Sequence, residues 1–269
     1  MTGASRESRP VVFLHGWCGR ADEVDSIRAA LPDRVLSPSW MPAGGDFDLE
    51  TWPTEPDPDR RLEIAREFAD GILERVRAAI LDAGFVGATI VGHSFGGGMA
   101  CLLAKDPRLA VRRLVLLDAT VPMTPERRRE CTDRMIPWVD RAATSGRLVA
   151  QAGWIAEASS WIPDFFSLED QGEIRLQIER RLLFAPVVEA ALSIAGAVQW
   201  SITESLESIA CPVHGLAGDP ARMPVEDLIA RRPDARIERI EGTGHYPHRF
   251  HPARTRAWLE AGPLPGLES

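Results

Sequence analysis

Short apolar runs alternate with amphipathic segments in the first 120 residues of the chain. Apolar runs of strand length, bounded by glycine or polar residues, are typical of buried β-strands. Between the second and third runs, apolar residues recur with a helical period from 60 to 83, and Gly84 marks the end of that helix. A second helix is predicted directly after the third strand. The predicted strands are 11–14, a weaker one at 34–40, 88–93 and 111–119.

The alternation stops in the middle of the chain. Residues 121–203, which we call the cap segment, contain several helix-like stretches and no convincing strand pattern. Beyond them the alternation resumes with strands at 211–218 and 235–242, each followed by a helix.

Strands that alternate with helices form parallel βαβ units. The sequence therefore predicts an α/β fold with a mostly parallel central sheet flanked by helices. Residues 1–120 and 204–269 would form this core, and the cap segment would be a helical insertion in it.

Composition limits the classes of partner. The 269 residues carry a net charge of −8, which disfavours nucleic acid and anionic membranes as partners. The first residues lack an apolar leader, and no run approaches 18 apolar residues, so a cytoplasmic location is expected. The four cysteines are scattered without a C-x-x-C spacing, so we expect no disulfide framework, no metal and no cofactor.

One glycine-rich stretch, "GHSFGGG" at 92–98, indicates chemistry. A G-x-S-x-G motif between a strand and a helix is typical of a sharp turn that exposes a nucleophilic serine. Large side chains at Gly92 or Gly96 would collide in such a turn. Ser94 is therefore the predicted nucleophile.

A serine nucleophile needs a general base. Six histidines are available, and His245 lies in "GTGHYP", a loop between the last predicted strand and the last helix. That loop falls at the carboxyl edge of the sheet, where sites in open α/β folds form. His245 is the predicted base, whereas His248 and His251 are expected at the surface.

The third member of the triad is an acid that orients the histidine. Asp219, after the strand at 211–218, has the expected chain order and is the preferred candidate. Asp118, at the end of "RLVLLD", is the alternative.

Backbone amides would bind the oxyanion. The expected donors are the amides of Phe95, directly after the nucleophile, and Trp17, in the "HGW" loop after the first strand. Aromatic residues would form an apolar substrate pocket, for which we select Trp17, Trp138, Trp154 and Trp161.

Taken together, "VVFLHGW", "IVGHSFGGGMA", "RLVLLDA", "CPVHGLAGD" and "GHYPHRFHP" resemble the α/β-hydrolase superfamily over about two-thirds of the chain. The "HGW" loop looks like that of small bacterial carboxylesterases of the pimeloyl-carrier-protein methyl ester esterase type. The resemblance implies that the cap segment roofs the active site. Two stretches depart from the family pattern: "SPSWMPAGGDFD" after the second strand, and "GDPARMP", where the usual G-x-x-D-x-x-x-P is one residue short.

These features predict a serine hydrolase that cleaves a carboxylic ester with an apolar part through an acyl-enzyme on Ser94. The same residues could serve a thioesterase, a lactonase or a C–C hydrolase, or the fold could be a non-hydrolytic lyase or ligand receptor. The charged run "ERRRE" at 126–130 could bind an anionic substrate or an acidic carrier protein, although a solvated helix start is the preferred interpretation.

Overall fold

A computed structural model of the chain describes residues 10–261, apart from 32–33, 42–43, 56, 169 and 220–221. The outer bounds of the predicted core, residues 1–9 and 262–269, lie outside the described residues.

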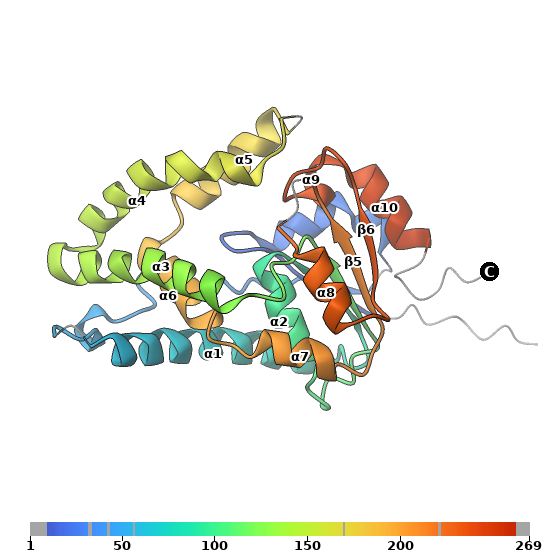
Figure 1. Cartoon of the computed structure of the whole chain (residues 1–269), viewed down its shortest axis with the longest axis horizontal. Helices are drawn as coiled ribbons and strands as arrows, with labels where there is room; N and C mark the ends of the chain where they lie inside the picture. Colours follow the sequence, from blue (N-terminus) through green and yellow to red (C-terminus); the bar gives the residue numbers. More distant parts are fainter. Residues whose placement is uncertain are drawn as a thin grey trace, which may run out of the picture.

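A single six-stranded sheet forms the centre of the molecule, with strand order β2-β1-β3-β4-β5-β6 and parallel pairing at every step (Figure 1). This confirms the predicted α/β fold with its parallel sheet. The edge strands, at 35–36 and 236–239, are shorter than their predicted ranges of 34–40 and 235–242, and the inner strands β3, β4 and β5 are each shorter by one to four residues. The strands are β1 (Val11–Leu14), β2 (Val35–Leu36), β3 (Thr89–His93), β4 (Arg113–Leu117), β5 (Val213–Ala217) and β6 (Arg236–Arg239).

The inner strands are buried on both faces, which explains their continuous apolar runs. Alternate residues of β1 divide between two clusters: Val12 packs on the side of α1 and α2, and Phe13 on the side of η1 and α10. The helices of the core are η1 (Ala21–Ser26), η2 (Arg28–Ala30), η3 (Leu49–Thr51), α1 (Pro58–Asp82), α2 (Phe95–Ala104), α8 (Val225–Arg231), α9 (Pro247–Phe250) and α10 (Pro252–Ala261).

The longest core helix, α1, has a clear start in the sequence. The Asp57 side chain accepts a hydrogen bond from the Arg60 amide at 3.0 Å, and Pro58 occupies the first helical position, where its missing N–H costs nothing. Its apolar stripe packs on the sheet and, further along, against α6.

Between β4 and β5, the described residues form helices only. Figure 1 shows α3, α4 and α5 projecting away from the sheet as a separate layer. In contrast, α6 packs against both α1 and α3, and α7 packs against α2, so these two helices connect the layer to the core. The elements are α3 (Pro125–Ser145), α4 (Arg147–Trp161), η4 (Ile162–Phe165), α5 (Glu173–Leu183), α6 (Val187–Ala197) and α7 (Ile202–Ser208).

None of the helices in the described residues combines the length and the apolar character that a membrane-spanning helix requires.

Candidate active site

Ser94 lies at the turn between β3 and α2. Its φ of 53° and ψ of −119° are strained values for a residue with a side chain. A Cβ atom on Gly92 would lie 2.6 Å from the Gly96 carbonyl oxygen, and one on Gly96 would overlap the Leu14 carbonyl. Both glycines are thus required by close backbone approach. The turn holds the Ser94 hydroxyl at the carboxyl edge of the sheet.

His245 contacts the serine directly. Its Nε2 lies 2.8 Å from Ser94 Oγ, and its Nδ1 lies 2.7 Å from Asp118 Oδ2. With the proton on Nδ1, the ring donates to the carboxylate and accepts from the serine hydroxyl. His245 and Asp118 are 2% and 0% exposed, so water does not compete for these contacts. The order Ser94, His245, Asp118 is the arrangement of a nucleophile, a base and an orienting acid.

Asp118 follows the last residue of β4 and has a φ of 39°. Its carboxylate accepts hydrogen bonds from three backbone amides beyond β5: Gly218 at 3.1 Å, Arg222 at 3.0 Å and Met223 at 3.3 Å. Several amide donors stabilise a buried negative charge without requiring a cationic partner. The chain after β5 therefore supports the acid with its backbone.

The preference for Asp219 is wrong in this geometry. Its side chain is exposed, whereas the Nδ1 atom that it would have to orient is already bonded to Asp118. The physical reason lies in the preceding residue: the Gly218 amide points at Asp118, so the backbone after β5 faces the triad and the Asp219 carboxylate turns outward. The one-residue shortening of "GDPARMP" was the sequence signal for this change.

A second histidine, His93, contacts the backbone of His245. His93 Nε2 lies 2.9 Å from the His245 carbonyl oxygen, which can only accept, so Nε2 carries the proton and Nδ1 the lone pair. Burial lowers the pKa of His93 well below its usual range, which keeps the ring neutral at physiological pH.

His248 is fully buried, contrary to the expected surface position, while His251 is partly exposed. The reason is the buried Glu23 of η1, whose Oε2 lies 3.7 Å from His248 Nε2 and 3.9 Å from His93 Nδ1. These donor atoms lie within 4.8 Å of one another and form one group that could hold a metal ion. The three residues do not line the cavity in front of Ser94, and no step considered below requires a metal.

The two predicted oxyanion donors flank the serine. Phe95 is the first residue of α2, so its amide has no acceptor within the helix. Trp17 lies in the turn after β1, and both residues line the same cavity as Ser94. The Trp17 indole donates a hydrogen bond to the Ala190 carbonyl of α6 at 3.1 Å, which fixes the position of its loop. The oxyanion role itself stays a prediction.

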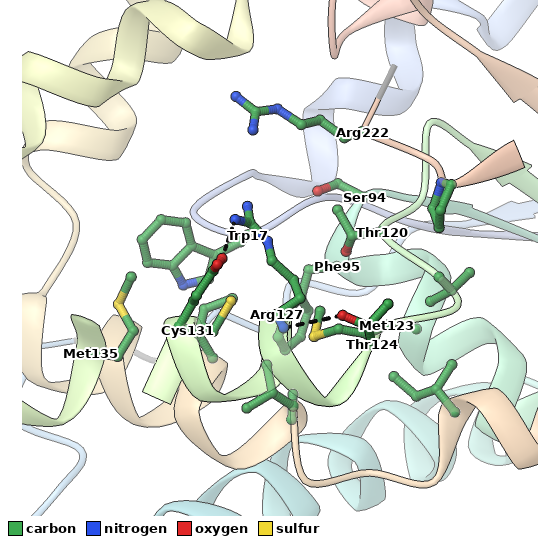
Figure 2. Close-up of a pocket in the computed structure, with 18 of the residues that line it drawn as sticks. Trp17, Ser94, Phe95, Thr120, Met123, Thr124, Arg127, Cys131, Met135 and Arg222 are labelled. Atoms are coloured by element: carbon green, nitrogen blue, oxygen red, sulfur yellow. Dashed lines mark hydrogen bonds and ion pairs between the residues drawn. The ribbon is translucent and has the colours of Figure 1, made fainter. Parts of the chain in front are cut away.

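A cavity of about 410 Å³ opens in front of Ser94 (Figure 2). Of the four tryptophans predicted to bind substrate, Trp17 and Trp161 line it, whereas Trp138 and Trp154 are buried behind its wall. The latter two pack edge to face with ring centroids 5.7 Å apart and so stabilise the cap segment. Other apolar lining residues are Phe95, Met135, Ile194, Val198, Trp200 and Ile202.

A comparison with family models matches residues 11–258 to the alpha/beta hydrolase family. The chain belongs to the alpha/beta hydrolase family.

Two curated relatives of this alpha/beta hydrolase align over nearly the whole chain. The pimeloyl-[acyl-carrier protein] methyl ester esterase of Aromatoleum aromaticum is 28% identical, and the match covers 94% of this chain and 98% of the relative. The 2-succinyl-6-hydroxy-2,4-cyclohexadiene-1-carboxylate synthase of Klebsiella pneumoniae is 25% identical over 93% of this chain and 91% of the relative.

Solved structures share the fold of this hydrolase. MenH from S. aureus superposes with a TM-score of 0.68 at 19% identity, covering 96% of this chain and 94% of that one. An esterase from Thermogutta terrifontis gives 0.69 at 20% identity, covering 94% of this chain and 88% of that one.

Sequence reasoning missed two features of the site. Trp40, from the unusual loop after β2, is buried and stacks between His15 and Phe95 with both centroid distances at 4.8 Å, which supports the turn that holds Ser94. Arg222 lines the cavity from the loop after β5. The stretch "GDPARMP" contained the signal for Arg222, because a basic residue there stands at the carboxyl edge of the sheet.

Proposed function

We propose that this member of the family is a serine esterase that hydrolyses small carboxylic esters with an apolar part. The single observation that carries the proposal is the continuous series of contacts from Ser94 through His245 to Asp118, at 2.8 and 2.7 Å, in which Ser94 lines a largely apolar cavity. The identity to a relative named as a methyl ester esterase supports ester chemistry.

In the proposed reaction, Ser94 Oγ attacks the ester carbonyl carbon while its proton moves to His245 Nε2. Asp118 stabilises the resulting imidazolium, and the amides of Phe95 and Trp17 bind the negative oxygen of the tetrahedral intermediate. The intermediate collapses as His245 returns the proton to the leaving alcohol, which leaves an acyl group on Ser94.

Water completes the cycle. His245 takes a proton from the water as it attacks the acyl carbonyl, and then gives that proton to Ser94 Oγ as the carboxylic acid leaves. Throughout the cycle His245 Nδ1 keeps its contact with Asp118, while Nε2 exchanges its proton in turn with Ser94, the leaving alcohol and the water.

The test is hydrolysis of p-nitrophenyl butyrate by the wild-type protein and Ser94→Ala. We expect kcat to fall by about 10⁵-fold or more, because removal of the nucleophile removes the covalent step. Ser159→Ala is the matched control, since this exposed hydroxyl of α4 bonds to the Ala156 carbonyl of its own helix and does not line the cavity. A wild-type protein that neither turns over the ester nor forms a phosphonate adduct on Ser94 would refute the proposal.

A cofactor-free lyase is the second candidate, because one relative is named as a synthase. A lyase could use His245 as a proton acceptor without acylation of the serine. Mass spectrometry of the protein quenched during p-nitrophenyl butyrate turnover separates the two: a butyryl group on Ser94 supports the esterase.

A further inference from the structure

Five charged residues line the largely apolar cavity: Arg127, Glu130, Arg134, Asp164 and Arg222. Arg127 pairs with Glu130 at 2.9 Å. Within the part of the chain that the structure describes, neither Arg222 nor Arg134 has a salt bridge; Arg134 lies 5.9 Å over the Trp161 ring instead. The cavity thus holds more positive than negative charge, although the protein as a whole carries −8.

The guanidinium of Arg222 is held in place by two contacts with η4. Its Nη2 donates to the Asp164 carbonyl oxygen at 2.7 Å, and its guanidinium carbon lies 4.7 Å from the centre of the Phe165 ring. That ring in turn lies 5.4 Å from the His245 ring. A guanidinium has five N–H donors, and the hydrogen bond to the Asp164 carbonyl uses one nitrogen of the group.

The two arginines stand on opposite sides of the serine. Figure 2 shows the Ser94 hydroxyl directed into the space between Arg222, from the β5 loop, and Arg127, from α3. Burial lowers the pKa of Arg222, and the positive charge of Arg127 lowers it further. Two like charges that face one cavity repel each other, and a bound anion between them would relieve that repulsion.

We propose that the substrate carries a carboxylate at the end of its acyl chain, as in a half-ester of a dicarboxylic acid, and that Arg222 and Arg127 bind this group. The ester bond rests on the function proposed above, whereas the anion site does not. Apolar lining residues such as Met135 and Val198 would contact the methylene chain between the two ends. Arginine is suited to this role because its planar fork pairs with both oxygens of a carboxylate.

Two esters with the same chain length provide the test. Monoethyl adipate and ethyl hexanoate have the same six-carbon acyl chain and leaving group, and differ only in a terminal carboxylate or methyl group. We expect wild-type kcat/KM to be higher for monoethyl adipate. Arg222→Met should reduce kcat/KM for monoethyl adipate by about 10- to 100-fold, the value of a charged hydrogen bond, and change ethyl hexanoate by less than about threefold.

Three further variants sharpen the result. Arg127→Met should also reduce the adipate preference, but less, since its side chain is 52% exposed and already paired. Arg222→Lys should keep part of the adipate preference that Arg222→Met loses. Lysine retains the positive charge but lacks the planar guanidinium that pairs with both carboxylate oxygens. Arg128→Met is the matched control: this neighbouring arginine of α3 lies outside the cavity and contacts Thr203 at 3.5 Å.

Calorimetric titration of adipate into Ser94→Ala, with and without Arg222→Met, tests the anion site without turnover. Binding that is lost with Arg222 supports the site even where neither ester is hydrolysed, an outcome that would remove the esterase proposal alone. Hydrolysis of ethyl hexanoate at or above the rate of monoethyl adipate, together with adipate binding that is absent or indifferent to Arg222→Met, would overturn the inference and leave the esterase intact.

Discussion

The ends of β4 and β5 are neighbours in the sheet, and each is followed by an aspartate, yet the two segments do different things. After β4, Asp118 is fully buried and its side chain contacts His245. After β5, Asp219 is exposed, while the backbone on either side of it donates amide hydrogen bonds to Asp118. One segment contributes a carboxylate, and the other contributes the amides that stabilise it.

The difference shows that chain order alone does not identify which aspartate contacts the histidine. Both aspartates lie between Ser94 and His245 in the sequence, and both follow a buried strand. They differ in whether the side chain or the backbone faces the carboxyl edge of the sheet, and that is set by the turn after each strand. The β5 segment also brings Arg222 to the cavity, so one loop serves both the acid and the substrate side.

The largest expected effect comes from exchanging the two acids for amides. Asp118→Asn should lower kcat for p-nitrophenyl butyrate by about 10³- to 10⁴-fold, because an amide no longer stabilises the imidazolium or fixes its tautomer. Asp219→Asn should change kcat by less than about twofold.

Thermal unfolding of both variants shows whether they are still folded. This control is needed because Asp118 also accepts backbone hydrogen bonds, so its replacement affects stability as well. If a folded Asp118→Asn protein keeps its rate while Asp219→Asn loses it, the roles of the two loops are the reverse of those described.

Gly218→Ala tests the backbone side of the comparison. A Cβ atom at Gly218 would overlap the carbonyl of Gly244, the residue directly before His245. We expect a loss of about 1–3 kcal/mol in the free energy of unfolding. A displaced His245 should lower kcat by up to about 100-fold. Urea unfolding and esterase kinetics measure the two effects.

Gly71→Ala is the matched glycine control. At this position in α1 the nearest atom to a new Cβ is the end of the Arg75 side chain, 3.9 Å away. In a helix interior, alanine should raise stability by about 0.5–1 kcal/mol. Equal behaviour of the two variants would show that the approach of the β5 loop to Gly244 does not matter.

The smallest expected effect is on the pH dependence of stability. It arises at the amino-terminal ends of β4 and β5, opposite the ends that carry Asp118 and Asp219. His214 of β5 is buried near Arg113 of β4 and Arg236 of β6; burial, together with these charges, lowers its pKa from 6.5 to about 4. Below pH 6.5 the unfolded chain binds a proton that the folded chain does not, so the free energy of unfolding falls between pH 6.5 and 4. We expect His214 to account for roughly 1–2 kcal/mol of that fall, allowing for partial solvation.

Urea unfolding of wild type and His214→Gln at pH 7 and at pH 4.5 measures this contribution. The variant lacks the titrating group, so its stability should fall less over that interval. Parallel loss of stability in both proteins would assign the acid sensitivity to other buried histidines, such as His93 and His248.

The features that were predictable from sequence are those encoded within a few residues. The apolar runs of β1, β3, β4 and β5 identify buried strands, and the glycines around Ser94 identify its turn because bulkier residues cannot fit there. His245 follows from its position in a loop after the last strand. Each inference depends on local spacing, which a single sequence shows directly.

The remaining features depend on contacts between distant segments. Asp118 and Gly218 are 100 residues apart. The one-residue shortening of "GDPARMP" indicates that the usual position of the acid is altered, but it does not show which aspartate will face the histidine. The burial of His248 follows from Glu23, which lies more than 200 residues earlier in the chain. The entry of Arg222 into the cavity depends on where η4 of the cap segment places the Asp164 carbonyl.

The hydrogen bond from the Trp17 indole to Ala190 has a consequence for how the protein would discriminate by size. It links the proposed oxyanion loop to α6, which is held between α1 and α3. An acyl group bulky enough to push α6 outward would also pull the Trp17 peptide from its place beside Ser94. Oversized substrates would then still bind but would react slowly. Discrimination against them would therefore appear as a lower kcat as well as a higher KM.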